Sequence, residues 1–223
     1  MLESDLTDLP ERDDGVANIA TSKIVTRVFD EVLDAIHQGR LTPGERLSDN
    51  TLAATYGVSR TPIREALQRL REIGVVEASA SRFTRVAIVS PQKTAEAVVV
   101  WSALFGALLD ETIPLAGPDV LEAMTKDHAD FLAAANERQM EAMATFNFSF
   151  YNRLTPLSNN ELLRRAITSV VHLVRLGGLN LPEDLDFDDL YKAQTVLLNA
   201  VRGRDLPLAH EALAAIRNIR IPR

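Results

Sequence analysis

The chain has 223 residues, of which 46% are hydrophobic, and a formal net charge of −7 at pH 7. This length and composition allow a buried core in one large or two small domains. The absence of cysteine excludes disulfides and thiolate metal sites, and the longest nearly apolar run, residues 97–109, is too short to cross a bilayer. Because no basic-then-apolar signal peptide opens the sequence, we expect a cytoplasmic protein without a membrane partner.

The charge is distributed unevenly along the sequence. Residues 1–17 hold six acids and one base, residues 18–90 hold ten bases and eight acids, and residues 91–223 hold thirteen bases and seventeen acids. The first segment is acidic and poor in aromatic residues, so we expect residues 1–17 to form a disordered tail. Only the second segment is positively charged, which makes it the candidate for a negatively charged partner.

Residues 18–90 have the pattern of a small helical domain that ends in a hairpin. Apolar residues at helical spacing predict a first helix from Ile19 to the break at Gly39. A second helix begins behind a Ser48 cap and a third behind a Ser59 cap. Two short alternating runs, residues 75–78 and 85–89, then predict a β-hairpin. Three helices followed by a hairpin predict a winged helix-turn-helix.

The turn between the second and third helices has the chemistry of a helix-turn-helix. Ala53 permits close approach of the two helices, Gly57 supplies a positive φ, and Ile63 holds the third helix inward. Such a turn directs the start of the third helix into the DNA major groove. There Arg60 and Arg64 can reach guanine edges or phosphates.

An alternative interpretation is that the cations of the third helix form a solvated face. Arg60, Arg64 and Arg71 lie within roughly 40° of one another on a helical projection, with Glu65 and Glu72 as surface partners. The turn chemistry and the hairpin favour DNA over this interpretation.

Residues 91–223 have a purely helical pattern. Gly, Pro and Asn breaks separate six segments, and the first is apolar on nearly every side, so that Trp101 and Phe105 lie inside a bundle or at a subunit contact. The six predicted helices span residues 92–112, 119–136, 138–154, 160–176, 187–202 and 206–218. The fold class is therefore mainly α, with a winged helix-turn-helix at 18–90 and an all-helical bundle at 91–223.

Four stretches of the sequence resemble a known family. The stretches LTPGERL and LAATYGVSRTPIREALQRLREIGVV resemble the DNA-binding domain of the GntR family of bacterial transcriptional regulators. The stretches FNFSFYNRLTPLSNNELL and LLNAVRGRDLPLAHEAL resemble the helical FCD domain of its FadR subgroup. The resemblance implies a homodimeric regulator, with repression the expected mode, that reads a palindromic operator in double-stranded DNA and responds to a small-molecule effector, typically a small organic acid.

The resemblance also implies individual DNA contacts. Ser59, Arg60, Thr61 and Arg64 match the recognition-helix residues of the family. Asn50 stands where some members carry a base-reading arginine, which predicts a different specificity there. Phe83 replaces the usual glycine of the wing tip, beside Arg82, which can reach the minor groove or a phosphate.

Many FCD domains hold a divalent metal through one Asp and three His. The matching positions here are Asn147, Tyr151, Gln194 and Ile216, which are poor metal ligands, so we expect neither a bound metal nor another cofactor. Asn147, Tyr151 and Gln194 can instead hydrogen-bond an effector, or they are satisfied polar groups of the core.

The four histidines show no metal-ligand spacing. His172 is a further candidate for effector contact, although a buried histidine bonded within the core is the alternative interpretation. We expect His37, His128 and His210 at the surface.

Two other classes of function remain as alternatives. An enzyme is disfavoured because the sequence shows no nucleophile–base spacing, phosphate-binding glycine loop or HExxH motif. A helical interaction protein whose winged helix binds protein rather than DNA is the second alternative, and salt-dependent retention on DNA would distinguish it.

Overall fold

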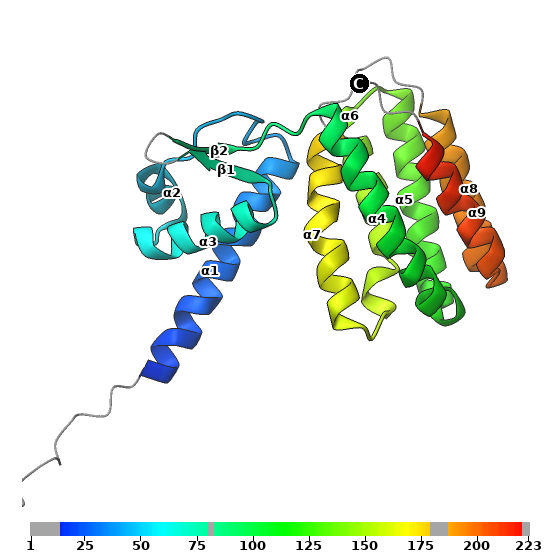
Figure 1. The fold of residues 1–223 in the computed structure, drawn as a ribbon, viewed down its shortest axis with the longest axis horizontal. Coiled ribbons are helices and arrows are strands. Elements are labelled where there is room, and N and C mark those ends of the chain that lie inside the picture. The colour runs from blue at the N-terminus through cyan, green and yellow to red at the C-terminus, as the bar shows by residue number, and fades with distance from the viewer. Residues whose placement is uncertain (1–13, 80–82, 179–186, 220–223) are drawn as a thin grey trace, which may run out of the picture.

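The protein is described by a computed structural model that covers residues 14–79, 83–178 and 187–219, with side chains described from residue 23 onward. Three helices and a hairpin form the N-terminal domain, and further helices form a bundle beside it (Figure 1). This architecture confirms the predicted fold class. The elements are α1 (Asp14–His37), α2 (Asp49–Tyr56), α3 (Arg60–Glu72), β1 (Val76–Ser79), β2 (Phe83–Val86), α4 (Pro91–Thr112), α5 (Pro118–Asn136), α6 (Met140–Asn152), α7 (Glu161–Gly178), α8 (Asp188–Gly203) and α9 (Leu206–Asn218), with short 3-10 turns at Ile113–Leu115 and Thr155–Leu157.

The helix-turn-helix forms as the sequence predicts. Ser48 caps α2 by accepting a hydrogen bond from the Thr51 amide, and Gly57 ends the helix in the left-handed conformation with φ 66°. A side chain at position 57 would be strained there, which explains the glycine. Ile63 is fully buried against α1, so the opposite face of α3 points to solvent.

The hairpin is antiparallel, with Glu77 opposite Arg85 and Ser79 opposite Phe83. Its second strand begins at Phe83, two residues before the predicted start. Two side-chain contacts explain the extension: Arg85 pairs with Glu77 at 2.5 Å, and its guanidinium lies 4.6 Å from the centre of the Phe83 ring. Arg82 lies outside the described residues.

The start of α1 also differs from expectation. The structure has α1 beginning at Asp14, so residues 14–17, which the sequence assigned to the tail, belong to the helix. Residues 1–13 lie outside the described part of the chain.

Helix α4 supplies the centre of the C-terminal bundle. Trp101 and Phe105 are 4% and 1% exposed, so they are buried within one chain. By length and hydropathy alone the segment Pro91–Leu115 resembles a membrane span, but α4 packs against α7 and α9. Its outer face carries Val99 and Val100, which are 60% and 49% exposed.

Helix α7 belongs to the bundle and also contacts the N-terminal domain. Leu176 is fully buried in the core that α1 and α3 build, and Leu173 packs against the same core. Gly74, which follows α3 with φ 78°, lies so close that an added Cβ would stand 2.9 Å from Leu173 Cδ2. The two domains therefore share a packed joint.

Candidate DNA interface and effector cavity

The N-terminal end of α3 exposes hydrogen-bond donors that have no partner among the described residues. Ser59 occupies the N-cap position with extended backbone, but its side chain makes no capping hydrogen bond, although the sequence predicted one. Arg60 and Thr61 follow it and are exposed. The first amides of a helix lack intrahelical acceptors and carry a partial positive charge, so this end suits a phosphate oxygen.

Arg64 lies one turn further along the same exposed face. Its Nε donates a 2.7 Å hydrogen bond to Asp49 Oδ2 at the start of α2, and the Arg64 side chain remains 67% exposed. An exposed ion pair contributes little stability, so DNA can replace the carboxylate at low cost. The sequence analysis considered Glu65 and Glu72 as partners and missed Asp49.

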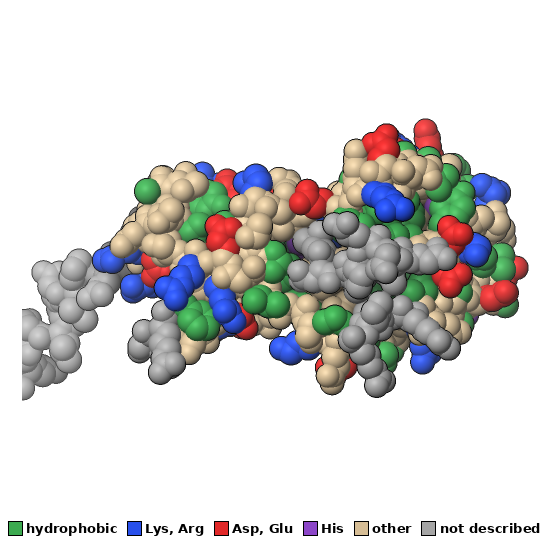
Figure 2. All heavy atoms as spheres, turned by 90° about the horizontal axis from the view of Figure 1, so that it is seen from above, with side chains coloured by type: hydrophobic (Ala, Val, Ile, Leu, Met, Phe, Trp, Pro, Cys, Tyr) green, Lys and Arg blue, Asp and Glu red, His purple; other side chains and the backbone are tan. Residues whose placement is uncertain are grey.

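Ser59, Arg60, Thr61 and Arg64 are thus brought together at one end of α3. Asn50 follows Asp49 in the first turn of α2 and is also exposed. Figure 2 shows several basic side chains close together on the N-terminal domain, with acidic side chains among them, and both signs of charge on the bundle.

The C-terminal bundle contains a cavity of about 160 Å³. Residues from α4, α5, α6, α7 and α9 line it, together with Phe187 and Leu190 at the start of α8. Asn147 and Tyr151 both lie on its wall, as the sequence predicted for one helical face, and Ile216 lies there too.

Gln194 stands behind the wall and holds Asn147 in place. It is fully buried, and its Nε2 donates a 2.9 Å hydrogen bond to Asn147 Oδ1. Its Oε1 lies 2.9 Å from Nδ1 of His128, which must carry the proton in this pair. The chain of bonds leaves Asn147 Nδ2 as the donor for a ligand.

Tyr151 has a buried hydroxyl without a hydrogen-bond partner among the described residues. Its ring makes edge-on contacts with Trp101 and Phe105, at centroid distances of 5.3 and 5.6 Å. Burial raises the pKa of the phenol, so the hydroxyl stays protonated and can donate. An unsatisfied buried hydroxyl beside a cavity is a site that a ligand acceptor would stabilise.

The residues at this site do not fit a divalent metal. Gln194 already uses its amide on Asn147 and His128, Tyr151 keeps its proton, and Ile216 has no donor atom. Within the described residues, no three His, Cys, Asp or Glu side chains are grouped to hold a metal ion.

His172 does not line the cavity. It lies in the joint between the domains, 6% exposed, with its ring stacked on His37 at a centroid distance of 5.2 Å. Burial, then the charge of Arg175, lowers the pKa of His172 to about 4 and that of His37 to about 3. His37 is only 3% exposed, so its expected place at the surface was wrong.

Of the remaining two histidines, one is partly buried and the other is exposed. His128 is half-buried, bonded to Gln194 and stacked on Tyr191 at 4.5 Å, so its surface placement was also wrong. Both errors arose because burial came from helices distant in sequence. His210 is exposed as expected and lies 2.7 Å from Asp110 Oδ1.

One residue of the cavity was missed by sequence reasoning. Arg175 of α7 lies on the wall, 4.8 Å from the centre of the Phe148 ring, and its Nη2 donates to Thr145 Oγ1 at 3.0 Å. In the sequence it is one base in the last turn of an amphipathic helix, where a cation is expected to face solvent.

The winged helix with exposed cations and the hollow helical bundle define a DNA-binding regulator with a ligand-binding domain. Residues 24–86 match the family model "Bacterial regulatory proteins, gntR family", and residues 96–218, more than half of the chain, match the FCD domain. The chain belongs to the GntR family and carries an FCD domain, in agreement with the FadR subgroup.

Relatives and solved structures agree with this assignment. A probable D-xylose utilization operon transcriptional repressor of Paenarthrobacter nicotinovorans is 28% identical over 208 residues, which cover 87% of this chain and 88% of that protein. The Nta operon transcriptional regulator of Aminobacter aminovorans is 32% identical over 140 residues, covering 60% and 64% of the two chains. The fold is similar to that of E. coli McbR/YncC, with a TM-score of 0.74, 22% identity and coverage of 87% and 93%.

Proposed function

We propose that this regulator is a cytoplasmic homodimeric repressor that reads a palindromic operator and leaves it when a small molecule fills the helical cavity. The observation that carries the DNA-binding role is the group of unused donors at the start of α3, namely Ser59, Arg60 and Thr61, beside Arg64. Asn50 and Arg82 are proposed as further contacts, to a base or phosphate near the recognition helix and at the wing. We propose a binding protein and not an enzyme.

Pairing of two chains is supported by the outer face of α4. Val99, Ala103 and Ala107 follow one another at four-residue spacing and are exposed, with Val100 beside them. A stripe of apolar side chains on a bundle surface is suited to burial against a second copy. Two recognition helices related by a two-fold axis would read two half-sites of a palindrome.

In the effector domain we propose that Asn147 and Tyr151 contact the small molecule directly. Gln194 acts by orienting Asn147, to which it is bonded at 2.9 Å. His172, packed against Phe148 and close to Arg175, is proposed to sense the ligand from behind the wall.

Selection of bound sequences from random duplex DNA by the full chain tests the proposal. We expect enrichment of an inverted repeat, a dimer mass in light scattering, and a monomer mass for Val99→Asp. The exposed Leu115→Asp variant, which lies in the 3-10 turn after α4, is the matched control and should remain dimeric. Retention on DNA that shows no salt dependence would instead support a winged helix that binds protein, and a monomer on and off DNA would refute the paired mode.

A further inference from the structure

Arg175 is a partly buried cation that contacts no anionic side chain among the described residues. Its Nη2 bonds to the neutral Thr145 hydroxyl, its guanidinium lies over Phe148, and its buried Nε has no hydrogen-bond partner among the described residues. A guanidinium offers five N–H donors, and among the described residues Thr145 is the hydrogen-bond acceptor for Arg175. Burying such a group without compensation is costly.

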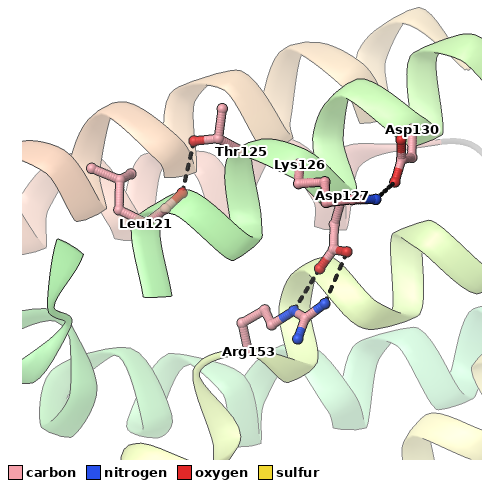
Figure 3. A network of polar contacts seen from close by, with 6 residues as sticks. All are labelled: Leu121, Thr125, Lys126, Asp127, Asp130 and Arg153. Atoms are coloured by element: carbon pink, nitrogen blue, oxygen red, sulfur yellow. Dashed lines mark hydrogen bonds and ion pairs between the residues drawn. The ribbon is translucent and has the colours of Figure 1, made fainter. Parts of the chain in front are cut away.

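Arg153, in the same bundle, shows how an ion-paired arginine differs from Arg175. Arg153 donates two hydrogen bonds to the buried Asp127, at 2.7 and 3.0 Å, and so joins α6 to α5 (Figure 3). Across the described ranges 14–79, 83–178 and 187–219, Arg175 has no such ion pair. The acid whose charge acts on it is Asp34, on α1 of the other domain. Burial lowers the pKa of Arg175 to about 10, which still leaves it charged at neutral pH.

The rest of the described cavity wall sets the other properties of a ligand. Arg175 is its single charged residue, and Asn147 and Tyr151 add neutral donors. One positive charge balances one negative charge, and a dianion would leave a charge uncompensated in an apolar space. The wall is otherwise dominated by aromatic and aliphatic side chains, among them Trp101, Phe131, Phe148 and Ile216.

We propose that the cavity selects an apolar monocarboxylate whose carboxylate binds Arg175 and whose aromatic or aliphatic body fills the space between Trp101 and Phe131. Tyr151 Oη and Asn147 Nδ2 complete the coordination of the carboxylate oxygens. Hydroxylated acids such as sugar acids are disfavoured, because the described part of the wall has too few polar groups to satisfy their hydroxyls. This inference rests on the proposed effector role of the cavity and names its ligand class.

Fluorescence of Trp101 gives a direct measurement, because it is the single tryptophan of the chain and lies on the cavity wall. The full-length protein is titrated with phenylacetate and hexanoate, with the matched alcohols 2-phenylethanol and 1-hexanol, and with gluconate. We expect each acid to bind at least about tenfold more tightly than its alcohol, since a charge-assisted hydrogen bond is lost in the alcohol. Gluconate should leave the emission unchanged.

Arg175→Met keeps the apolar stem and removes the charge. It should weaken phenylacetate binding by about 10- to 100-fold and leave 2-phenylethanol within about twofold. The control is Arg165→Met on the same helix, where the exposed Arg165 pairs with Glu161 and is not among the residues that line the cavity. Tyr151→Phe should weaken the acid several-fold without affecting the alcohol.

Operator binding, measured without added acid or alcohol, separates this inference from the proposed function. If operator DNA is bound but neither acid binds, or if acid and alcohol bind equally to the unmodified chain, the assignment of Arg175 is wrong while the regulator remains. The same conclusion follows if a folded Arg175→Met variant binds phenylacetate as tightly as the unmodified chain. If the unmodified chain does not bind operator DNA, the proposed function itself is wrong.

Discussion

The recognition helix and the cavity both present arginine, but in opposite surroundings. Arg60 and Arg64 are exposed on α3, and Arg64 is held by a carboxylate that solvent reaches. Arg175 lies against Phe148, and its buried Nε has no partner among the described residues. Water screens the charges of Arg60 and Arg64 strongly, and it screens the charge of Arg175 only weakly.

The difference shows how one side-chain type supports two kinds of recognition. At the exposed helix each cation contributes modestly, and affinity comes from several contacts made together along DNA, with release of counterions. In the cavity we expect a single cation in a poorly hydrated space to discriminate between a charged and a neutral ligand. The surroundings of each arginine therefore determine its ligand more than its own chemistry does.

The first prediction concerns the exposed arginines of α3 and operator binding. Arg60→Ala and Arg64→Ala should each weaken operator binding by about 1–3 kcal/mol if the arginine reads a guanine. Fluorescence anisotropy with a selected operator measures the loss. Arg165→Ala, also an exposed helical arginine in an ion pair, should keep full affinity. Unchanged affinity in both α3 variants would contradict a DNA contact at this end of the helix.

A second prediction concerns the joint between the two regions, where His37 and His172 stack beside Arg175. Their folded pKa values, about 3 and about 4, lie below the ordinary 6.5, so the unfolded chain takes up protons first as pH falls. Stability is complete above about pH 6.5 and is lost below it, by up to about 1.4 kcal/mol per pH unit for each histidine.

Urea unfolding at pH 7 and pH 5 measures this loss. His172→Phe keeps a flat ring against His37 and Phe148 and should reduce the loss of stability between the two pH values. Leu162→Phe, at a position of α7 that is 78% exposed and carries no titratable group, is the control and should leave the loss unchanged. An equal pH dependence in the unmodified chain and in His172→Phe would show that this ring does not titrate on unfolding.

The smallest predicted effect concerns the ion pair of the exposed Arg64 and its influence on operator affinity. Asp49→Asn removes the carboxylate that competes with DNA for Arg64, so operator affinity should rise by about 0.2–1 kcal/mol. Asp130→Asn, which removes the acid paired with Lys126 on α5, should have no effect on DNA binding. Weaker operator binding by Asp49→Asn would mean that Asp49 orients Arg64 for DNA.

Local signals in the sequence predicted most of the fold. Gly57 placed the turn before α3, and Ser90–Pro91 placed the start of α4, where the Ser90 side chain accepts from the Lys93 amide. Such caps depend on residues three or four apart, so the sequence contains all the necessary information. The same reasoning placed Asn147 and Tyr151 on one face of α6 and, as the structure has it, on the cavity wall.

Contacts between distant segments could not be predicted in this way. Arg64 meets Asp49 across the turn, and His37 meets His172 across the domains, over separations that no helical period encodes. Arg175 has the pattern of a solvent-facing cation until the packing of α6 against α7 is known. The unpredicted part of the site is thus the part made by tertiary packing.

The packing of Leu176 in the N-terminal core joins the cavity wall to the domain that carries α3. Arg175 precedes Leu176 directly, so the same turn of α7 forms part of the cavity wall and part of the core beneath α3. Binding equilibria at two sites of one molecule are linked reciprocally. By whatever factor a carboxylate in the cavity lowers operator affinity, operator DNA lowers the affinity of the cavity for that carboxylate, and the coupling can be measured from either end.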